Sequence, residues 1–90
     1  MEFSGTIYEV MPKETGEGQK GIWVKQPFVI EMPNGKYNTK VAISLWGELA
    51  DTPLERGAEI VVDANVESKE SKGRWYTDVR AWKVIANSSK

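Results

Sequence analysis

The sequence predicts an all-β fold, a small five-stranded barrel with a short helix between its third and fourth strands. Apolar and polar residues alternate with a period of two through most of the chain. Turn sequences rich in glycine, proline and asparagine separate the alternating runs, and one stretch, residues 47–57, breaks the alternation. Ninety residues is the size of one compact domain with a single modest core.

The first two strands are predicted on either side of a polar loop. Residues 2–10 are rich in strand formers, and Gly5 among them indicates a bend or a bulge. The glycine-punctuated segment 12–21 is expected to be a loop, and 22–32 the second strand. Pro27 lies inside that strand and has no N–H to donate, so we expect a bulge or an unpaired position there.

The rest of the chain continues this pattern. The third strand shows the clearest alternation, and Gly57 is expected to end the short helix, or the one or two helical turns, that follows it. A turn is expected over 33–35, the third strand over 37–46 and the helical segment over 47–57. The fourth strand is expected over 59–68, a turn over 70–73 and the last strand over 74–85.

This order of elements is that of the OB fold, a partly open barrel in which few strand edges are exposed. An SH3-like barrel and a small sandwich are the competing architectures, and the position of the helix favours the OB fold. We expect residues 1–86 to form one OB-fold domain and residues 87–90 a short flexible tail.

Composition excludes several function classes. The chain has no cysteine and no histidine, so it lacks thiolate nucleophiles, the commonest general base and the commonest transition-metal ligand. The acidic residues show no calcium-loop spacing. We therefore predict no enzyme, no metal site and no cofactor. Residues 1–6 do not resemble a signal peptide, and no apolar run could cross a bilayer, so a cytoplasmic protein without membrane contact is expected.

Two tryptophans lie on the predicted outer faces of strands. Trp46 lies opposite the core-facing Val41, Ile43 and Leu45 of its strand. A solvated aromatic ring can stack on a nucleic-acid base, which contributes about 1–3 kcal/mol per base. The same pattern also fits a tryptophan that caps the barrel or meets another subunit. Trp23 shares a face with Lys25, and either contacts a ligand or covers the barrel mouth.

The last strand also has two predicted faces. Tyr76 and Arg80 are expected to point outward, and a bulge is expected near Trp82, where the apolar alternation is irregular. The core is predicted to include Phe3, Ile7, Phe28, Ile30, Val79 and Ala81.

Charge is distributed unevenly, although the net charge is only −1. Residues 48–63 contain five carboxylates and one arginine, so cations exceed anions over the rest of the chain. In OB folds, ligands bind on the second and third strands between the first and last loops, and the acidic segment lies outside that region. Cations in the loops suit a phosphate ligand, but serve equally for solvation. They are Lys13, Lys20, Lys36, Lys40, Lys69, Lys72 and Arg74.

Three segments resemble bacterial single-stranded-DNA-binding proteins. Val41-Ala-Ile-Ser-Leu-Trp-Gly-Glu-Leu-Ala-Asp51 is similar to the end of their third strand, an aromatic-Gly-x-Leu-Ala-Glu motif. Leu54–Val62 resembles their step into strand four, and Arg74–Ala81 resembles their closing strand. The whole chain is also similar to short OB-like domain proteins of Bacteroidetes and their phages. The resemblance places Trp46 at the stacking aromatic and Trp75 at a tyrosine of the closing strand.

Two departures from that family are visible. The hairpin between the last two strands has a shorter loop without the family's tryptophan, and we expect no acidic tail of the kind that recruits repair and replication partners in that family. We therefore expect DNA binding without recruitment of repair partners by that route.

The favoured function is sequence-tolerant, strongly salt-dependent binding of single-stranded DNA, or of RNA, in replication, recombination or repair. Family analogy implies a homo-oligomer. The alternative is a protein-interaction or oligomerisation module whose exposed tryptophans form an interface. Carbohydrate binding fits the fold, but nothing in the sequence favours it. Bases are expected to stack on Trp46, Trp23, Tyr76 and Trp75, and phosphates to contact Lys25, Lys40, Lys72, Arg74 and Arg80.

Overall fold

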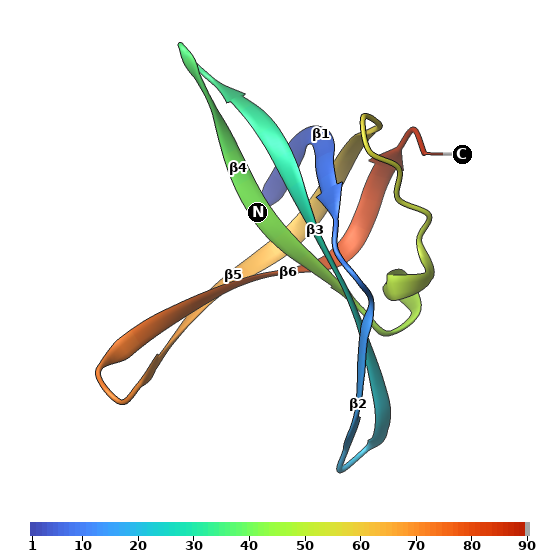
Figure 1. The fold of residues 1–90 in the computed structure, drawn as a ribbon, viewed down its shortest axis with the longest axis vertical. Helices are drawn as coiled ribbons and strands as arrows, with labels where there is room; N and C mark the ends of the chain where they lie inside the picture. The colour runs from blue at the N-terminus through green and yellow to red at the C-terminus, as the bar shows by residue number, and fades with distance from the viewer. Residues whose placement is uncertain (90) are drawn as a thin grey trace.

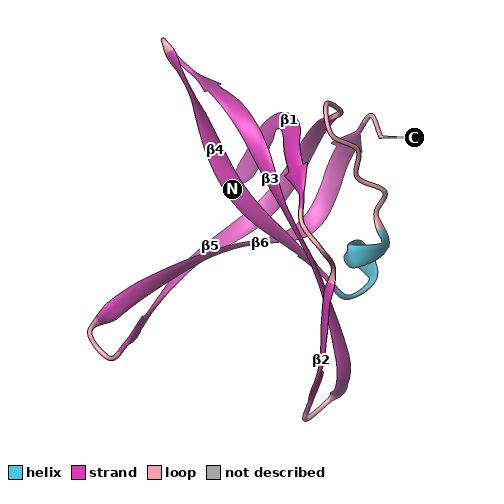
Figure 2. Ribbon diagram, in the orientation of Figure 1, coloured by secondary structure: helices cyan, strands magenta, loops and turns pink. Residues whose placement is uncertain are grey.

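The structure is a computed structural model that describes residues 1–89, and of Asn34 only the backbone. It consists almost entirely of β-strands, with one short helical turn (Figure 1, Figure 2). The elements are β1 Glu2–Val10, β2 Glu14–Gly18, β3 Gly21–Asn34, β4 Tyr37–Trp46, the 3₁₀ helix η1 Gly47–Asp51, β5 Glu59–Ser71 and β6 Arg74–Asn87.

Five strands pair in a closed ring. β1 pairs with both β3 and β5, which gives the circular order β1, β3, β4, β6, β5. The neighbours are antiparallel except β4 and β6, which are parallel and joined through two residue pairs, Ser44–Arg80 and Leu45–Ala81. This is the strand order of the OB fold, so the predicted fold class is confirmed.

The core lies inside this ring and is built from alternate residues of each strand. Phe28, Ile30, Leu45, Ile60 and Val62 have no exposed surface at all. Ile7, Ile43, Ala64 and Ala81 complete the buried cluster, and Phe3, Val41 and Val79 pack against it half-buried. The period-two alternation therefore predicted the core correctly.

The predicted loop over 12–21 is wrong in part, because it contains β2. This strand forms a hairpin with the start of β3, in which Glu14 faces Lys25 and Gly16 faces Trp23. Its polar composition disguised it, since β2 lies outside the core and needs no apolar alternation.

The predicted helix between the third and fourth strands is a single 3₁₀ turn. η1 spans Gly47–Asp51 and ends well before Gly57, and the chain then continues irregularly to β5. Pro53 cannot donate an intrahelical hydrogen bond, and Thr52, which precedes it, adopts an extended conformation with ψ of 128°. The proline therefore explains why the helix does not reach 57.

Three hairpins extend beyond the ring (Figure 1). We call them the β2–β3 arm (residues 14–25), the β3–β4 arm (32–39) and the β5–β6 arm (65–79). β5 and β6 continue past their predicted ends, and the turn between them is only Lys72-Gly73. Apolar residues on the arms, such as Ile22 and Val66, are exposed because no second layer covers them.

Irregular pairing occurs close to where the sequence indicated it. β6 has register shifts that leave Trp82 and Ile85 without partners on β5, so the expected bulge at Trp82 is confirmed. In β1 the shift falls at Tyr8 rather than Gly5. Gly5 instead permits close approach of β3, because a Cβ there would lie 2.5 Å from the Glu31 carbonyl oxygen.

Residues 87–89 make specific hydrogen bonds at the end of β6. The Glu59 N–H donates to Ser88 Oγ at 2.8 Å, and the Glu55 N–H donates to Ser89 Oγ at 3.0 Å. Asn87 Nδ2 donates to the Pro53 carbonyl at 2.9 Å. The last residue of the predicted tail, 90, lies outside the described residues.

Gln26 fixes the connection between β1 and β2. Its buried Nε2 donates to the carbonyl oxygens of Met11 at 2.7 Å and Pro27 at 3.0 Å. The Met11 N–H also donates to the Pro27 carbonyl, so the one polar backbone group of Pro27 faces this connection rather than β4. Pro27 pairs in register with Ser44 without a bulge, and Gln26 Nε2 gives the Met11 carbonyl the donor that Pro27 lacks.

We expect Gln26→Leu to lower the free energy of unfolding by about 1–3 kcal/mol, because the substitution leaves the half-buried Met11 carbonyl without its donor. Urea denaturation of both proteins measures this difference. Gln19→Leu, in the tight turn of the β2–β3 arm, is the matched control and should change stability by less than about 0.5 kcal/mol. Equal stability of the Gln26→Leu variant and the wild type would contradict this role.

Candidate nucleic-acid interface

Four of the predicted site residues form one cluster on the outer face of β3, β4 and β6. The rings of Trp23 and Trp46 lie 5.7 Å apart, centroid to centroid, with an interplanar angle of 48°. The Arg80 guanidinium lies 4.5 Å from the Trp46 ring centroid, and Lys25 Nζ lies 5.6 Å from it. We call these four residues the tryptophan cluster.

Strand pairing explains why these residues meet. Lys25 pairs directly with Trp46 across β3 and β4, and Arg80 pairs with Ser44, two residues before Trp46. Side chains two apart on a strand share a face, so Arg80 and Trp46 both project outward beside each other. The cations attract the electron-rich ring face, which orients Trp46 while leaving it half-buried.

A groove adjoins the cluster between the β2–β3 arm and the β5–β6 arm. It is lined by Met11 and Pro12 from the β1–β2 connection, by Ala42 and Ser44 of β4, and by residues 77–79 of β6, with Lys25 at one side. None of the lining residues belongs to the acidic segment 48–63. An apolar floor beside exposed aromatic rings suits flat, partly apolar groups such as bases.

The groove nevertheless contains charges of both signs. Glu14 pairs with Lys25 across β2 and β3, and Asp78 lies two residues before Arg80. These carboxylates partly cancel the two cations. The groove and the cluster beside it therefore have little net positive charge.

Lys40 lies at the other end of β4, about 20 Å along the strand from Trp46. Its Nζ lies 4.3 Å from the ring centroid of Tyr8, which the bulge in β1 turns outward. Arg56 Nε donates to the Tyr8 carbonyl oxygen at 3.2 Å. Lys40 is therefore not part of the tryptophan cluster, and the structure joins it to a tyrosine that the sequence analysis did not select.

The remaining predicted residues lie on the β5–β6 arm. Trp75 and Tyr76 are 68 % and 55 % exposed, and their strand neighbours opposite are Glu70 and Lys69. Arg74 and Lys72 are at the tip, where Lys72 adopts a positive φ of 52°. This second group of rings and cations lies on the arm that bounds the groove, and it makes no direct contact with Trp46.

Gly16 is a site feature that sequence reasoning missed. The Trp23 ring lies across it, so close that a Cβ on Gly16 would meet Cε2 at 2.5 Å and Nε1 at 2.8 Å. The Gly18-Gln-Lys-Gly21 turn was the available signal, since a two-residue connection flanked by glycines is typical of a tight hairpin.

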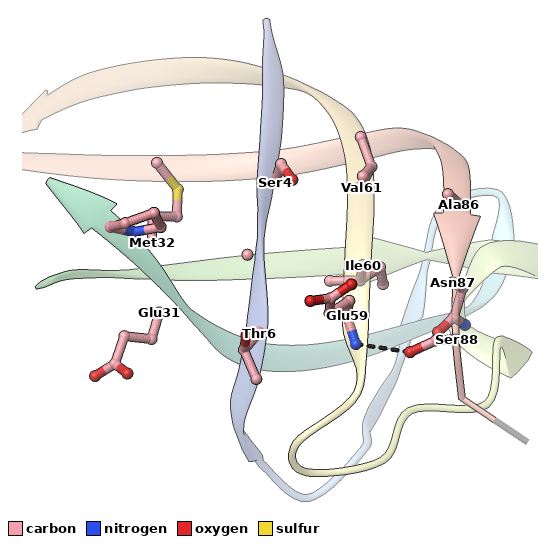
Figure 3. A pocket seen from close by; sticks show the side chains of 12 residues that line it. Ser4, Thr6, Glu31, Met32, Glu59, Ile60, Val61, Ala86, Asn87 and Ser88 are labelled. Carbon is pink, nitrogen blue, oxygen red and sulfur yellow. Dashed lines mark hydrogen bonds between the residues drawn. The ribbon is translucent and has the colours of Figure 1, made fainter.

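Another pocket lies away from the tryptophan cluster, where β1, β3, β5 and β6 meet (Figure 3). Ser4, Thr6, Met32 and Val61 line it, and the carboxylates of Glu31 and Glu59 lie at its edge. It contains none of the predicted site residues. Its negative charges would repel a phosphate, so this pocket is a poor candidate for a nucleic acid.

Two further findings apply to the described residues. Residues 1–89 include no helix that is long and apolar enough to cross a membrane. The same residues include no group of three or more acidic side chains placed to hold a metal ion.

The chain belongs to the DUF3127 family, a domain of unknown function, whose model matches residues 2–85. No curated protein shows significant similarity to it. The match runs from the start of β1 into β6 and so includes residues of every strand of the ring.

Three solved structures illustrate what this chain is similar to. The SSB domain of a Synechococcus protein is 16 % identical, with a TM-score of 0.66 over 93 % of this chain and 90 % of that one. The second OB-fold domain of replication protein A from Methanococcus maripaludis is 17 % identical, with a TM-score of 0.71 over 99 % and 86 %. A small single-stranded DNA-binding protein from Streptomyces coelicolor is 14 % identical, with a TM-score of 0.53 over 100 % and 94 %. At these identities the likeness shows a shared fold.

We expect Arg80 and Trp46 to stabilise each other by about 0.5–1 kcal/mol, as a cation close to an indole face does. Urea denaturation of Arg80→Met, Trp46→Ala and the double variant measures this coupling. Lys36→Met, in the turn of the β3–β4 arm, combined with Trp46→Ala is the control and should show none. Additive effects of Arg80→Met and Trp46→Ala would contradict the contact.

Proposed function

We propose that this protein binds single-stranded DNA along the groove beside the tryptophan cluster, without catalysis and with little sequence preference. The observation that carries the proposal is the pair of indole rings at 5.7 Å with an arginine and a lysine beside them. Aromatic rings bind unstacked bases, and adjacent cations bind the phosphates between them.

The chemistry of the cluster favours single strands over duplexes. The bases of a duplex are stacked on one another, and their faces are not accessible to a tryptophan ring. The cluster offers two aromatic ring faces and two cations, and its only other polar groups are the two indole N–H groups. Every base has a π-face, so stacking of this kind discriminates weakly among sequences.

The mixed charges of the groove predict a shallow dependence on salt. Each phosphate neutralised on a single strand contributes about −0.7 to the slope of log K against log salt concentration. With Lys25 and Arg80 as the cations of the cluster, the expected slope is about −1.4. Stacking then supplies most of the affinity, and the carboxylates of Glu14 and Asp78 keep the electrostatic part small.

The β5–β6 arm extends the proposed binding surface for longer strands. Trp75, Tyr76, Lys72 and Arg74 repeat the combination of exposed rings and cations on an element that bounds the groove. Lys40 lies at the opposite end of the β4 outer face, where a strand that follows β4 would pass it. Such a surface would serve DNA replication, recombination or repair, where single strands are exposed.

Self-association is a second proposal, supported by a separate apolar patch. The two bulges in β6 turn Trp82 and Ile85 outward, leaving them 55 % and 46 % exposed. Exposed apolar groups of this size commonly mark protein contacts. A second copy of the chain that covers this patch would form a homo-oligomer, which the family resemblance also implies. The tryptophan cluster would then stay accessible.

Intrinsic tryptophan fluorescence during titration with oligo(dT) tests the main proposal. We expect quenching with saturation for the wild type, and an affinity weaker by about 5- to 160-fold for Trp46→Ala, which is about 1–3 kcal/mol of stacking. Tyr37→Ala is the matched control, because Tyr37 is 79 % exposed at the tip of the β3–β4 arm, and its affinity should not change.

Absence of quenching by a folded wild-type protein at low salt would overturn DNA binding at this cluster. If the protein then sediments as an oligomer, and Trp82→Ser alone makes it monomeric, the second proposal remains as its function.

The arm proposal predicts a dependence on strand length. Tyr76→Ala combined with Arg74→Ala should weaken binding of a long oligo(dT) at least threefold, because both side chains lie on the face of Arg80 and one stacked base and one phosphate contact are lost. Binding of an oligonucleotide just long enough for the cluster should not change. Fluorescence anisotropy of labelled oligonucleotides of increasing length measures this, and an equal loss at every length would contradict a separate contact on the arm.

A further inference from the structure

Gly16 of β2 lies directly opposite Trp23 in the β2–β3 arm. The indole ring folds over this glycine, and the three heavy atoms nearest to the position of a Cβ all belong to it: Cζ2, Cε2 and Nε1. A side chain at residue 16 would therefore overlap the ring. This position is occupied by the Trp23 side chain instead.

Backbone conformation does not require glycine at this position. The glycines of positive φ are Gly21, Gly35, Gly47, Gly57 and Gly73, and Gly16 is not among them. In an ordinary strand position alanine is tolerated better than glycine. Space for the indole is thus the physical reason for glycine here, and a large aromatic side chain packed over a cross-strand glycine is a recognised way to stabilise a sheet edge.

The contact with Gly16 also determines how Trp23 meets Trp46. Trp23 has β2 on one side and the Trp46 ring at 5.7 Å on another, yet it remains 38 % exposed. Trp46 is approached by Arg80 and Lys25 as well, and is less exposed. The Trp23 ring is held on two sides and exposed to solvent elsewhere, so it is preorganised. The rotation of the ring is already restricted before a base binds.

We propose that Gly16 is a positioning residue, which holds the Trp23 ring against Trp46 and so prepares it to stack on a base. The inference rests on the proposed function, because the ring is positioned for that ligand. It adds β2, a strand absent from the predicted five-stranded order, to the binding site.

Titration of oligo(dT) with Gly16→Ala, Trp23→Ala and the double variant tests the proposal. Gly18→Ala is the matched control, because it adds the same methyl group to the same strand and meets Trp23 only at 3.6 Å, an ordinary contact. Thermal unfolding shows whether each variant is folded. The double variant removes the ring that the methyl group would overlap, so it stays informative if Gly16→Ala alone is unstable.

We expect Gly16→Ala to weaken oligo(dT) binding by about threefold or more, and Gly18→Ala to leave it unchanged. In the Trp23→Ala background, Gly16→Ala should have no further effect, because Gly16 acts through that ring. A merely structural glycine would lower affinity in both backgrounds, which would overturn the proposal.

If the wild type binds, Trp46→Ala weakens binding and Gly16→Ala behaves like Gly18→Ala, the positioning role is wrong while the proposed function stands. If the folded wild type does not bind oligo(dT), the proposed function fails and this inference fails with it.

Discussion

The contact between β4 and β6 rests on two residue pairs, Ser44–Arg80 and Leu45–Ala81, and it determines both the core and the outer face. On the inner side it buries Leu45 and Ala81 within the same cluster. On the outer side it brings Arg80 beside Trp46. Because side chains alternate across a strand, a shift of this register by one residue would place Arg80 in the core and remove it from the tryptophan.

The same contact explains why the arms diverge. β4 and β6 are parallel and meet over two pairs only, so the segments that precede the contact on each strand separate. Each continues as half of a hairpin, the β3–β4 arm and the β5–β6 arm, and the β2–β3 arm extends at the other end of β3. The groove lies between two of these arms, which carry exposed rings and cations without a second layer over them.

Periodicity predicted what depends on local burial. The alternation in β4 correctly separated Ile43 and Leu45 from Trp46, and the irregular apolar pattern near Trp82 correctly indicated a bulge. It did not reveal β2, because an edge strand outside the core carries no apolar alternation. The helical segment is one turn, the shortest of the predicted alternatives, because Pro53 interrupts the residues from 47 to 57.

The composition of the site depended on long-range pairing, which residue patterns do not contain. Trp23, Trp46, Lys25 and Arg80 were each selected from their own strand, yet only the register places them together. The same register separates Lys40 from them and joins it to Tyr8, a residue that the first strand's pattern gave no reason to select. Gly16 was interpreted as a loop glycine because its neighbour across the hairpin was not predicted.

The most direct test of DNA binding at the tryptophan cluster follows the indole N–H signals of the four tryptophans by ¹H–¹⁵N NMR during titration with a short oligo(dT). If a base stacks on the cluster, the signals of Trp23 and Trp46 shift together, with one midpoint. Shifts confined to Trp75 or Trp82, with Trp23 and Trp46 unchanged at saturation, would contradict it.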